Sequence, residues 1–241
     1  GSERFTIQFY DTEADMVIAD RISNAKGDMV WANDGCHLFY AVIDDNHRPY
    51  RVMCHEVGTP TTADTLVYEE LDPGFFLSIA PSKSRRFVVI SAHDHTTSEV
   101  RLVDASVIDT IPVLVAPRER DVEYDVSHHG DKLLILTNAD GAEDFKIVEA
   151  PLTNPGRANW TDWQAYKAGT LIRSVVVFTG HVVRLERIDG LPRIVITELA
   201  SSEEHAIEFD EVDGLVRLVA IGDAVLQSGA DERQSERRHE L

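Results

Sequence analysis

Histidines are the residues of this sequence that most readily suggest chemistry, because neutral imidazole binds zinc and titrates near neutral pH. His93 and His95 alternate around Asp94, so both side chains would face one side of an extended segment. His128 and His129 are adjacent, and adjacent strand residues point to opposite faces, which disfavours a shared metal site. The alternative is that these histidines hydrogen-bond neighbouring segments and that Asp94 caps a turn. We expect this second arrangement and assign no metal ligand.

Two Cys-His pairs, Cys36-His37 and Cys54-His55, form a second candidate metal site. They would lie on one hairpin that turns at Asp44–Asn46. If Cys36 opposes His55, then His37 opposes Cys54 on the other face, and two ligands per face are too few for a closed zinc site. A one-residue slip would change these partners. We expect thiols packed between strands, reduced as in a cytoplasmic protein.

Acidic clusters are the third candidate. Alternating carboxylates on one strand face could line a tunnel and attract peptides that carry Lys or Arg. Solvated outer edges are the alternative. The clusters are Glu69-Glu70-Asp72, Asp121-Glu123-Asp125 and Glu208-Asp210-Glu211.

Large aromatic residues in the inner strands are expected to fill gaps between sheets. These residues are Trp31, Phe75-Phe76 and Tyr124, while Trp160 and Trp163 are expected to pack around an outer strand.

A serine nucleophile on a sharp strand-to-helix turn would require the pattern G-x-S-x-G. No two glycines of this chain stand four residues apart, so the pattern does not occur. Catalytic triads have other settings, so this observation alone does not exclude catalysis. The sequence gives no reason to assign a catalytic or a cofactor-binding residue, and we expect no cofactor.

Charge and hydropathy limit the partners of the chain. Its 241 residues carry 42 Asp and Glu against 23 Lys and Arg, a formal charge of −19. This balance argues against binding to nucleic acid or to anionic lipid. No apolar run approaches the roughly 18–20 residues that span a bilayer, and the N-terminus does not read as a signal peptide. We therefore expect a soluble, cytoplasmic protein.

A strand-turn-strand pattern that returns every 46 to 50 residues must position all these side chains. In each copy, two apolar runs flank a polar turn, and the four turns fall at Gly35, Ser84, Gly130 and Gly180. A fixed period in this range is typical of stacked or radially arranged units. The copies are Met29–Ile43, Phe75–Ser91, Val122–Thr137 and Ile172–Glu186.

Each repeat contains four short strands, which is the composition of a β-propeller blade. The first strands of the four repeats are predicted at Met29–Ala32, Phe75–Ala80, Val122–Val126 and Ile172–Phe178. The second are predicted at Cys36–Ile43, Arg86–Ser91, Lys132–Thr137 and His181–Glu186. The third and fourth are predicted at Tyr50–Glu56 and Asp64–Glu70, Ser98–Asp104 and Ile111–Ala116, Asp144–Ala150 and Asn159–Tyr166, and Pro192–Leu199 and His205–Asp210.

The two ends of the chain allow two architectures, an open arc and a closed ring. Arg4–Tyr10 and Asp15–Arg21 read as the outer strands of a further blade, which gives an all-β partial propeller of about four and a half four-stranded blades over residues 1–227. Leu215–Gln227 could supply the missing strands and close a five-bladed ring. We favour the open arc. Residues 228–241 are polar and charged, and we expect them to be a disordered tail.

Four segments in matching order resemble the propeller of the prolyl oligopeptidase family, and most closely its oligopeptidase B branch. They are Asp72–Phe76, Ser91–Glu99, Glu123–Asp131 and Leu136–Ile147. The resemblance covers roughly residues 1–210. It implies a serine endopeptidase in which the propeller covers an α/β-hydrolase domain, admits short peptides, and serves cleavage after Lys or Arg.

The resemblance predicts short basic peptides and a hydrolase domain as partners. Because the sequence departs from the family after about Glu211, we expect a truncated propeller that is inactive alone. The alternative is a free-standing propeller that serves as a protein-interaction module.

Overall fold

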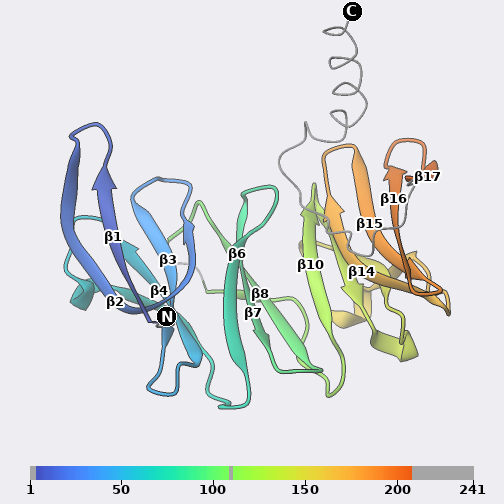
Figure 1. The fold of residues 1–241 in the computed structure, drawn as a ribbon, viewed down its shortest axis with the longest axis horizontal. Coiled ribbons are helices and arrows are strands. Elements are labelled where there is room, and N and C mark those ends of the chain that lie inside the picture. Colours follow the sequence, from blue (N-terminus) through green and yellow to red (C-terminus); the bar gives the residue numbers. More distant parts are fainter. Residues whose placement is uncertain (1–3, 109–110, 208–241) are drawn as a thin grey trace, which may run out of the picture.

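The chain folds into four antiparallel β-sheets that stand side by side in a row (Figure 1). A computed structural model describes residues 4–108 and 111–207. The sheets have the orders β1-β2-β3-β4-β5, β6-β7-β8-β9, β10-β11-β12-β13 and β14-β15-β16-β17, so nearly every strand pairs with its neighbour in sequence. Helical structure in the described ranges is restricted to three short 3-10 turns, at Thr61–Ala63, Ala139–Gly141 and Arg157–Asn159.

The strand bounds agree closely with the repeat. The strands are β1 (Phe5–Asp11), β2 (Met16–Trp31), β3 (His37–Ile43), β4 (Pro49–Glu56), β5 (Thr65–Glu69), β6 (Phe76–Pro81), β7 (Phe87–His93), β8 (Ser98–Asp104), β9 (Val113–Leu114), β10 (Tyr124–His129), β11 (Lys132–Thr137), β12 (Lys146–Pro151), β13 (Thr161–Gln164), β14 (Thr170–Val177), β15 (His181–Ile188), β16 (Leu191–Glu198) and β17 (Glu204–Ile207). The all-β partial propeller is therefore confirmed.

Apolar side chains fill the spaces between consecutive sheets. The first interface joins Phe39 and Val52 of the first sheet to Leu77 and Ile90 of the second. Corresponding clusters join the second sheet to the third and the third to the fourth. Because alternate residues of each strand point to opposite faces, a middle sheet is apolar on both faces. This two-sided burial explains why the inner strands read as nearly continuous apolar runs.

The N-terminal hairpin differs from the sequence-based expectation of a separate half blade. β2 does not end at Arg21 but continues to Trp31, so it pairs with β1 and then with β3 in one sheet. The ladder is irregular between Ala25 and Met29, and Gly27 lies in that irregular stretch. The hairpin covers the face of the first sheet that is turned away from the second, where Phe9 stacks on His55 with ring centroids 5.5 Å apart.

Within the described ranges, no strand of the first sheet pairs with a strand of the fourth, and β1 and β17 lie at opposite ends of the row (Figure 1). Leu215–Gln227 and residues 228–241 lie outside those ranges, as does the end of the expected strand His205–Asp210. No helix in the described part of the chain has the length and apolar content that crossing a membrane requires.

Candidate functional site

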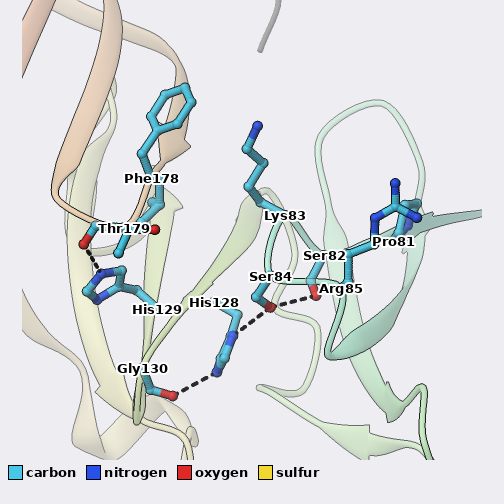
Figure 2. A pocket seen from close by; sticks show the side chains of 11 residues that line it. Pro81, Ser82, Lys83, Ser84, Arg85, His128, His129, Gly130, Phe178 and Thr179 are labelled. Carbon is cyan, nitrogen blue, oxygen red and sulfur yellow. Dashed lines mark hydrogen bonds between the residues drawn. The ribbon is translucent and has the colours of Figure 1, made fainter. Parts of the chain in front are cut away.

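Three hairpin turns, one from each of the last three sheets, surround a cavity of about 870 Å³ (Figure 2). They connect β6 to β7, β10 to β11 and β14 to β15, and are the turns that the repeat places at Ser84, Gly130 and Gly180. Their convergence follows from the repeat, because equivalent strands of consecutive sheets run in the same direction. The lining residues are Pro81, Ser82, Lys83, Ser84, Arg85, His128, His129, Gly130, Val177, Phe178 and Thr179.

His128 holds the first two of these turns together (Figure 2). Its Nε2 lies 2.9 Å from the carbonyl oxygen of Gly130, which can only accept, so Nε2 carries the proton. Nδ1 of the neutral ring then accepts the hydroxyl proton of Ser84, whose Oγ lies 2.8 Å away. Burial, followed by the charges of Arg86 and His129, lowers the pKa of His128, although the bond to Gly130 acts in the opposite direction. The neutral form that this arrangement requires is therefore favoured.

His129 points to the opposite side of β10 and joins the third turn. Its Nε2 donates to the carbonyl oxygen of Thr179 over 3.0 Å. The two adjacent histidines thus hydrogen-bond two different neighbouring sheets, as expected from strand geometry. Together they fix the three turns relative to one another.

Cationic side chains dominate the charge of the cavity. Nζ of Lys83 lies 4.8 Å from the centre of the Phe178 ring, so the ammonium group interacts with an aromatic face of the fourth sheet. Arg85 follows two residues later and adopts a left-handed backbone conformation with φ of 60°. No Asp or Glu is among the lining residues.

His93 and His95 take no part in this cavity. Oδ1 of Asp94 accepts the backbone N–H groups of Thr96 and Thr97 over 2.8 and 2.7 Å, which is the predicted turn cap. These two hydrogen bonds and the neighbouring histidines lower the pKa of Asp94, although partial burial opposes the shift. In residues 4–108 and 111–207, no three His, Cys, Asp or Glu side chains are grouped as a metal site.

The register considered for the two Cys-His pairs, with Cys36 opposite His55, is not the one that forms, and the observed register differs from it by two residues. Leu38 pairs with His55 and Phe39 with Cys54, because the turn between β3 and β4 is centred one residue later than expected. Asp44 sets this turn by accepting the backbone N–H of Arg48 over 2.9 Å. The expected packing of a thiol between sheets holds for Cys54, which is buried, whereas Cys36 is exposed, and the two form no disulfide.

The first acidic cluster makes ion pairs and a turn cap within the fold. Glu69 pairs with Arg51, and Asp72 caps the turn at Gly74. Glu70 is buried and accepts from Nη2 of Arg118 over 2.5 Å.

The second cluster is more open. Asp121 and Asp125 are exposed and Glu123 is half-buried, with Asp125 on the inner strand β10. The third cluster, Glu208-Asp210-Glu211, lies outside the described residues.

Two of the aromatic residues do not fill gaps between sheets. Phe75 and Tyr124 are buried as predicted, but Trp31 is 49% exposed and Phe76 is 42% exposed. Trp160 packs edge-on against Tyr124 with centroids 5.5 Å apart, which agrees with the expected packing role.

Sequence reasoning missed the cavity and its cations. Lys83 and Arg85 lie at the turn of the second repeat. His128 and Phe178 lie at the equivalent turns of the third and fourth repeats. Comparing turn residues at one stage across the repeats would have brought them together.

Comparison with known proteins gives the same architecture. Residues 1–237 match the family described as prolyl oligopeptidase, N-terminal beta-propeller domain. Dipeptidyl aminopeptidase BI of Pseudoxanthomonas mexicana is 37% identical over 206 residues, which are 85% of this chain and 28% of the relative. Protease 2 of Moraxella lacunata is 31% identical, over 80% of this chain and 28% of the relative.

A solved structure supports the assignment. Oligopeptidase B from Leishmania major superposes with a TM-score of 0.81 at 29% identity, over 87% of this chain and 30% of that one. The chain thus spans less than a third of the proteins that it matches. On these grounds the chain belongs to the prolyl oligopeptidase family and lies in its N-terminal β-propeller domain.

Proposed function

We propose that this chain is the substrate-gating propeller portion of an oligopeptidase B-like serine endopeptidase that cleaves short peptides after Lys or Arg. The propeller limits the size of peptides that reach a hydrolase domain, and that domain supplies the nucleophile. The chain alone is inert. It acts in the cytoplasm, in line with cysteines that form no disulfide.

The observation that carries this proposal is the agreement of the sheets, in order and in space, with oligopeptidase B from Leishmania major. A second oligopeptidase B, from Trypanosoma brucei and with covalently bound antipain, superposes with a TM-score of 0.79. The net charge of −19 supports attraction of Lys- and Arg-containing peptides, because a field of one sign raises the local concentration of oppositely charged ligands.

A second candidate is release of dipeptides from peptide N-termini. It is favoured by the relative that is 37% identical, whose name is dipeptidyl aminopeptidase BI. The two candidates share the gating role of the propeller and differ in the bond that is cleaved.

A chimera tests the gating role. In it, this chain replaces the matching 30% of oligopeptidase B from Leishmania major. We expect cleavage of a fluorogenic dipeptide after Arg to exceed cleavage after Ala by about tenfold or more, which is at least ~1.4 kcal/mol of discrimination. An unfolded protein substrate should resist cleavage.

The hydrolase portion without a propeller is the matched control and should cleave the unfolded protein. Equal cleavage of that substrate by the chimera would contradict gating. Loss of the preference for Arg would contradict the specificity. Mass spectrometry of the products separates internal cleavage from release of N-terminal dipeptides. The chain by itself should hydrolyse no Arg dipeptide, and hydrolysis blocked by a serine-reactive phosphonate would contradict its inertness.

A further inference from the structure

We propose that the cavity between the three hairpin turns binds the free C-terminal carboxylate of a peptide. The choice of a peptide as the ligand rests on the proposed function, whereas the choice of a carboxylate rests on the cavity itself. The charge preference of this cavity is the opposite of that expected for the acidic clusters, which would attract the basic groups of a substrate.

The charge of the lining is opposite to the charge of the chain. Acidic residues outnumber basic ones by 42 to 23, yet the lining contains Lys83, Arg85 and two histidines and no carboxylate. A cavity walled by one sign of charge concentrates ligands of the other sign. The ligand that this lining selects is therefore an anion.

Within residues 4–108 and 111–207, Lys83 and Arg85 form no ion pair, unlike the buried Arg184, which lies 3.0 Å from Glu186. Lys83 is instead placed over the ring of Phe178, which orients the ammonium group without neutralising its charge. In Figure 2 the side chains of Lys83 and Phe178 extend to the same side of the turns. The charges of Lys83 and Arg85 therefore remain available for charge-assisted hydrogen bonds to a carboxylate.

The cavity is built before a ligand arrives. Ser84 binds His128, His128 binds Gly130, and His129 binds Thr179, so each of the three turns is tied to another by a hydrogen bond. A preorganised site loses less conformational entropy on binding than a mobile one. The volume of about 870 Å³ lies within the usual range for ligand sites, so a few peptide residues fit beside the carboxylate.

The positive charge of the lining also disfavours the basic side chains of a peptide. Lys83 and Arg85 repel Lys and Arg side chains, so the cavity holds the chain end and leaves the basic residue of the substrate elsewhere. Peptides would therefore be oriented as well as attracted.

NMR titration of the complete, ¹⁵N-labelled chain tests the proposal without any hydrolase domain. The probe is acetyl-Gly-Ala-Ala-Gly with a free C-terminal carboxylate, and its C-terminal amide is the comparison. We expect the acid to shift the amide signals of Ser84, Gly130 and Thr179 and to bind at least about tenfold more tightly than the amide. Equal affinity of acid and amide, or shifts elsewhere, would overturn the proposal.

Lys83→Gln/Arg85→Gln should abolish the advantage of the acid over the amide. Lys167→Gln/Arg120→Gln is the matched control, because it removes the same two charges at exposed positions outside the cavity. Equal weakening of peptide-acid binding in both variants would show that the preference for the acid comes from the net charge of the chain, and would overturn the proposal. Inorganic phosphate should compete weakly, and competition as strong as that of the peptide acid would show a general anion site instead.

These results are independent of the proposed function. Failure of the carboxylate to bind would leave gating and cleavage by the chimera untouched. Failure of the chimera to discriminate would leave binding to this chain measurable.

Discussion

Nδ1 of His55 lies 2.7 Å from Oδ1 of Asp64, at a site where the histidine side chain has no exposed surface. On the other side of the ring, Nε2 lies 3.4 Å from Oδ2 of Asp20, which belongs to the N-terminal hairpin. Tyr40 donates to the second oxygen of Asp64 over 2.6 Å. One buried imidazole therefore connects the hairpin β1–β2 to the sheet that it covers.

Replacing this imidazole should loosen the hairpin. His55→Ala leaves Asp64 and Asp20 without their shared hydrogen-bond partner in a buried site, and each unsatisfied buried polar group costs about 1–3 kcal/mol of unfolding free energy. Urea denaturation measures the loss. His95→Ala, at an exposed histidine, should change the unfolding free energy by less than about 0.5 kcal/mol, and similar losses in both variants would contradict the role of His55.

Arg118 joins the first two sheets to the connection that leads into the third. Its Nη2 lies 2.5 Å from Glu70 and 3.1 Å from Glu99, and its guanidinium carbon lies 3.9 Å from the centre of the Phe75 ring. Arg118→Ala leaves two buried carboxylates without this cation, so we expect a loss of about 3 kcal/mol in unfolding free energy. Arg120→Ala is the control, since that side chain is 93% exposed, and it should be nearly neutral.

The same network predicts a dependence on pH. Burial alone would raise the pKa of Glu99, but hydrogen bonds from Arg118 and Arg101 outweigh burial and lower it below its ordinary value of 4.5. Because the unfolded chain binds this proton more readily, the stabilisation is complete above pH 4.5 and is lost as the pH falls through the lower, folded-state pKa.

Arg118→Ala should shrink the acid loss of stability, because without this cation the folded-state pKa of Glu99 rises toward its value in the unfolded chain, so the curves of the two proteins converge as the pH falls. Unfolding free energies of the original chain and the variant, measured between about pH 3 and pH 6, provide the check. Parallel curves would show that Arg118 does not govern the ionisation of Glu99.

The hydroxyl of Tyr124 connects the third sheet to the second. It accepts the backbone N–H of Val100 over 2.8 Å and donates to the carbonyl oxygen of Ala116 over 2.6 Å. Burial raises the pKa of Tyr124 to about 12, so the proton is retained at neutral pH.

Tyr124→Phe keeps the ring packing and removes the hydroxyl, leaving a buried N–H and a buried carbonyl without their partner. The expected loss is about 1–3 kcal/mol of unfolding free energy, measured by thermal and chemical denaturation. Tyr166→Phe, at a tyrosine that is 39% exposed, should have a small effect. A larger loss in Tyr166→Phe than in Tyr124→Phe would refute this account.

Sequence reasoning reached the strand order, the turns and the family, but it missed features that depend on contacts distant in sequence, among them two in the first sheet. An alternating pattern is unchanged by a slip of two residues, so the faces of Cys54 and His55 could be predicted while their partners could not. The continuation of β2 past Arg21 depends on Phe9 and Ile22 packing against the first sheet. Neither feature leaves a periodic signal.

The sequence by itself determined that the chain is a series of four-stranded units with turns at Ser84 and Gly130, because local apolar runs and turn residues specify a hairpin wherever it lies. The tertiary structure decided that Lys83 meets Phe178 and that His128 meets Ser84. Those side chains belong to different sheets, and the packing of one sheet on the next sets their distances. The repeat predicts that such turns recur, and only the packed arc makes them one cavity.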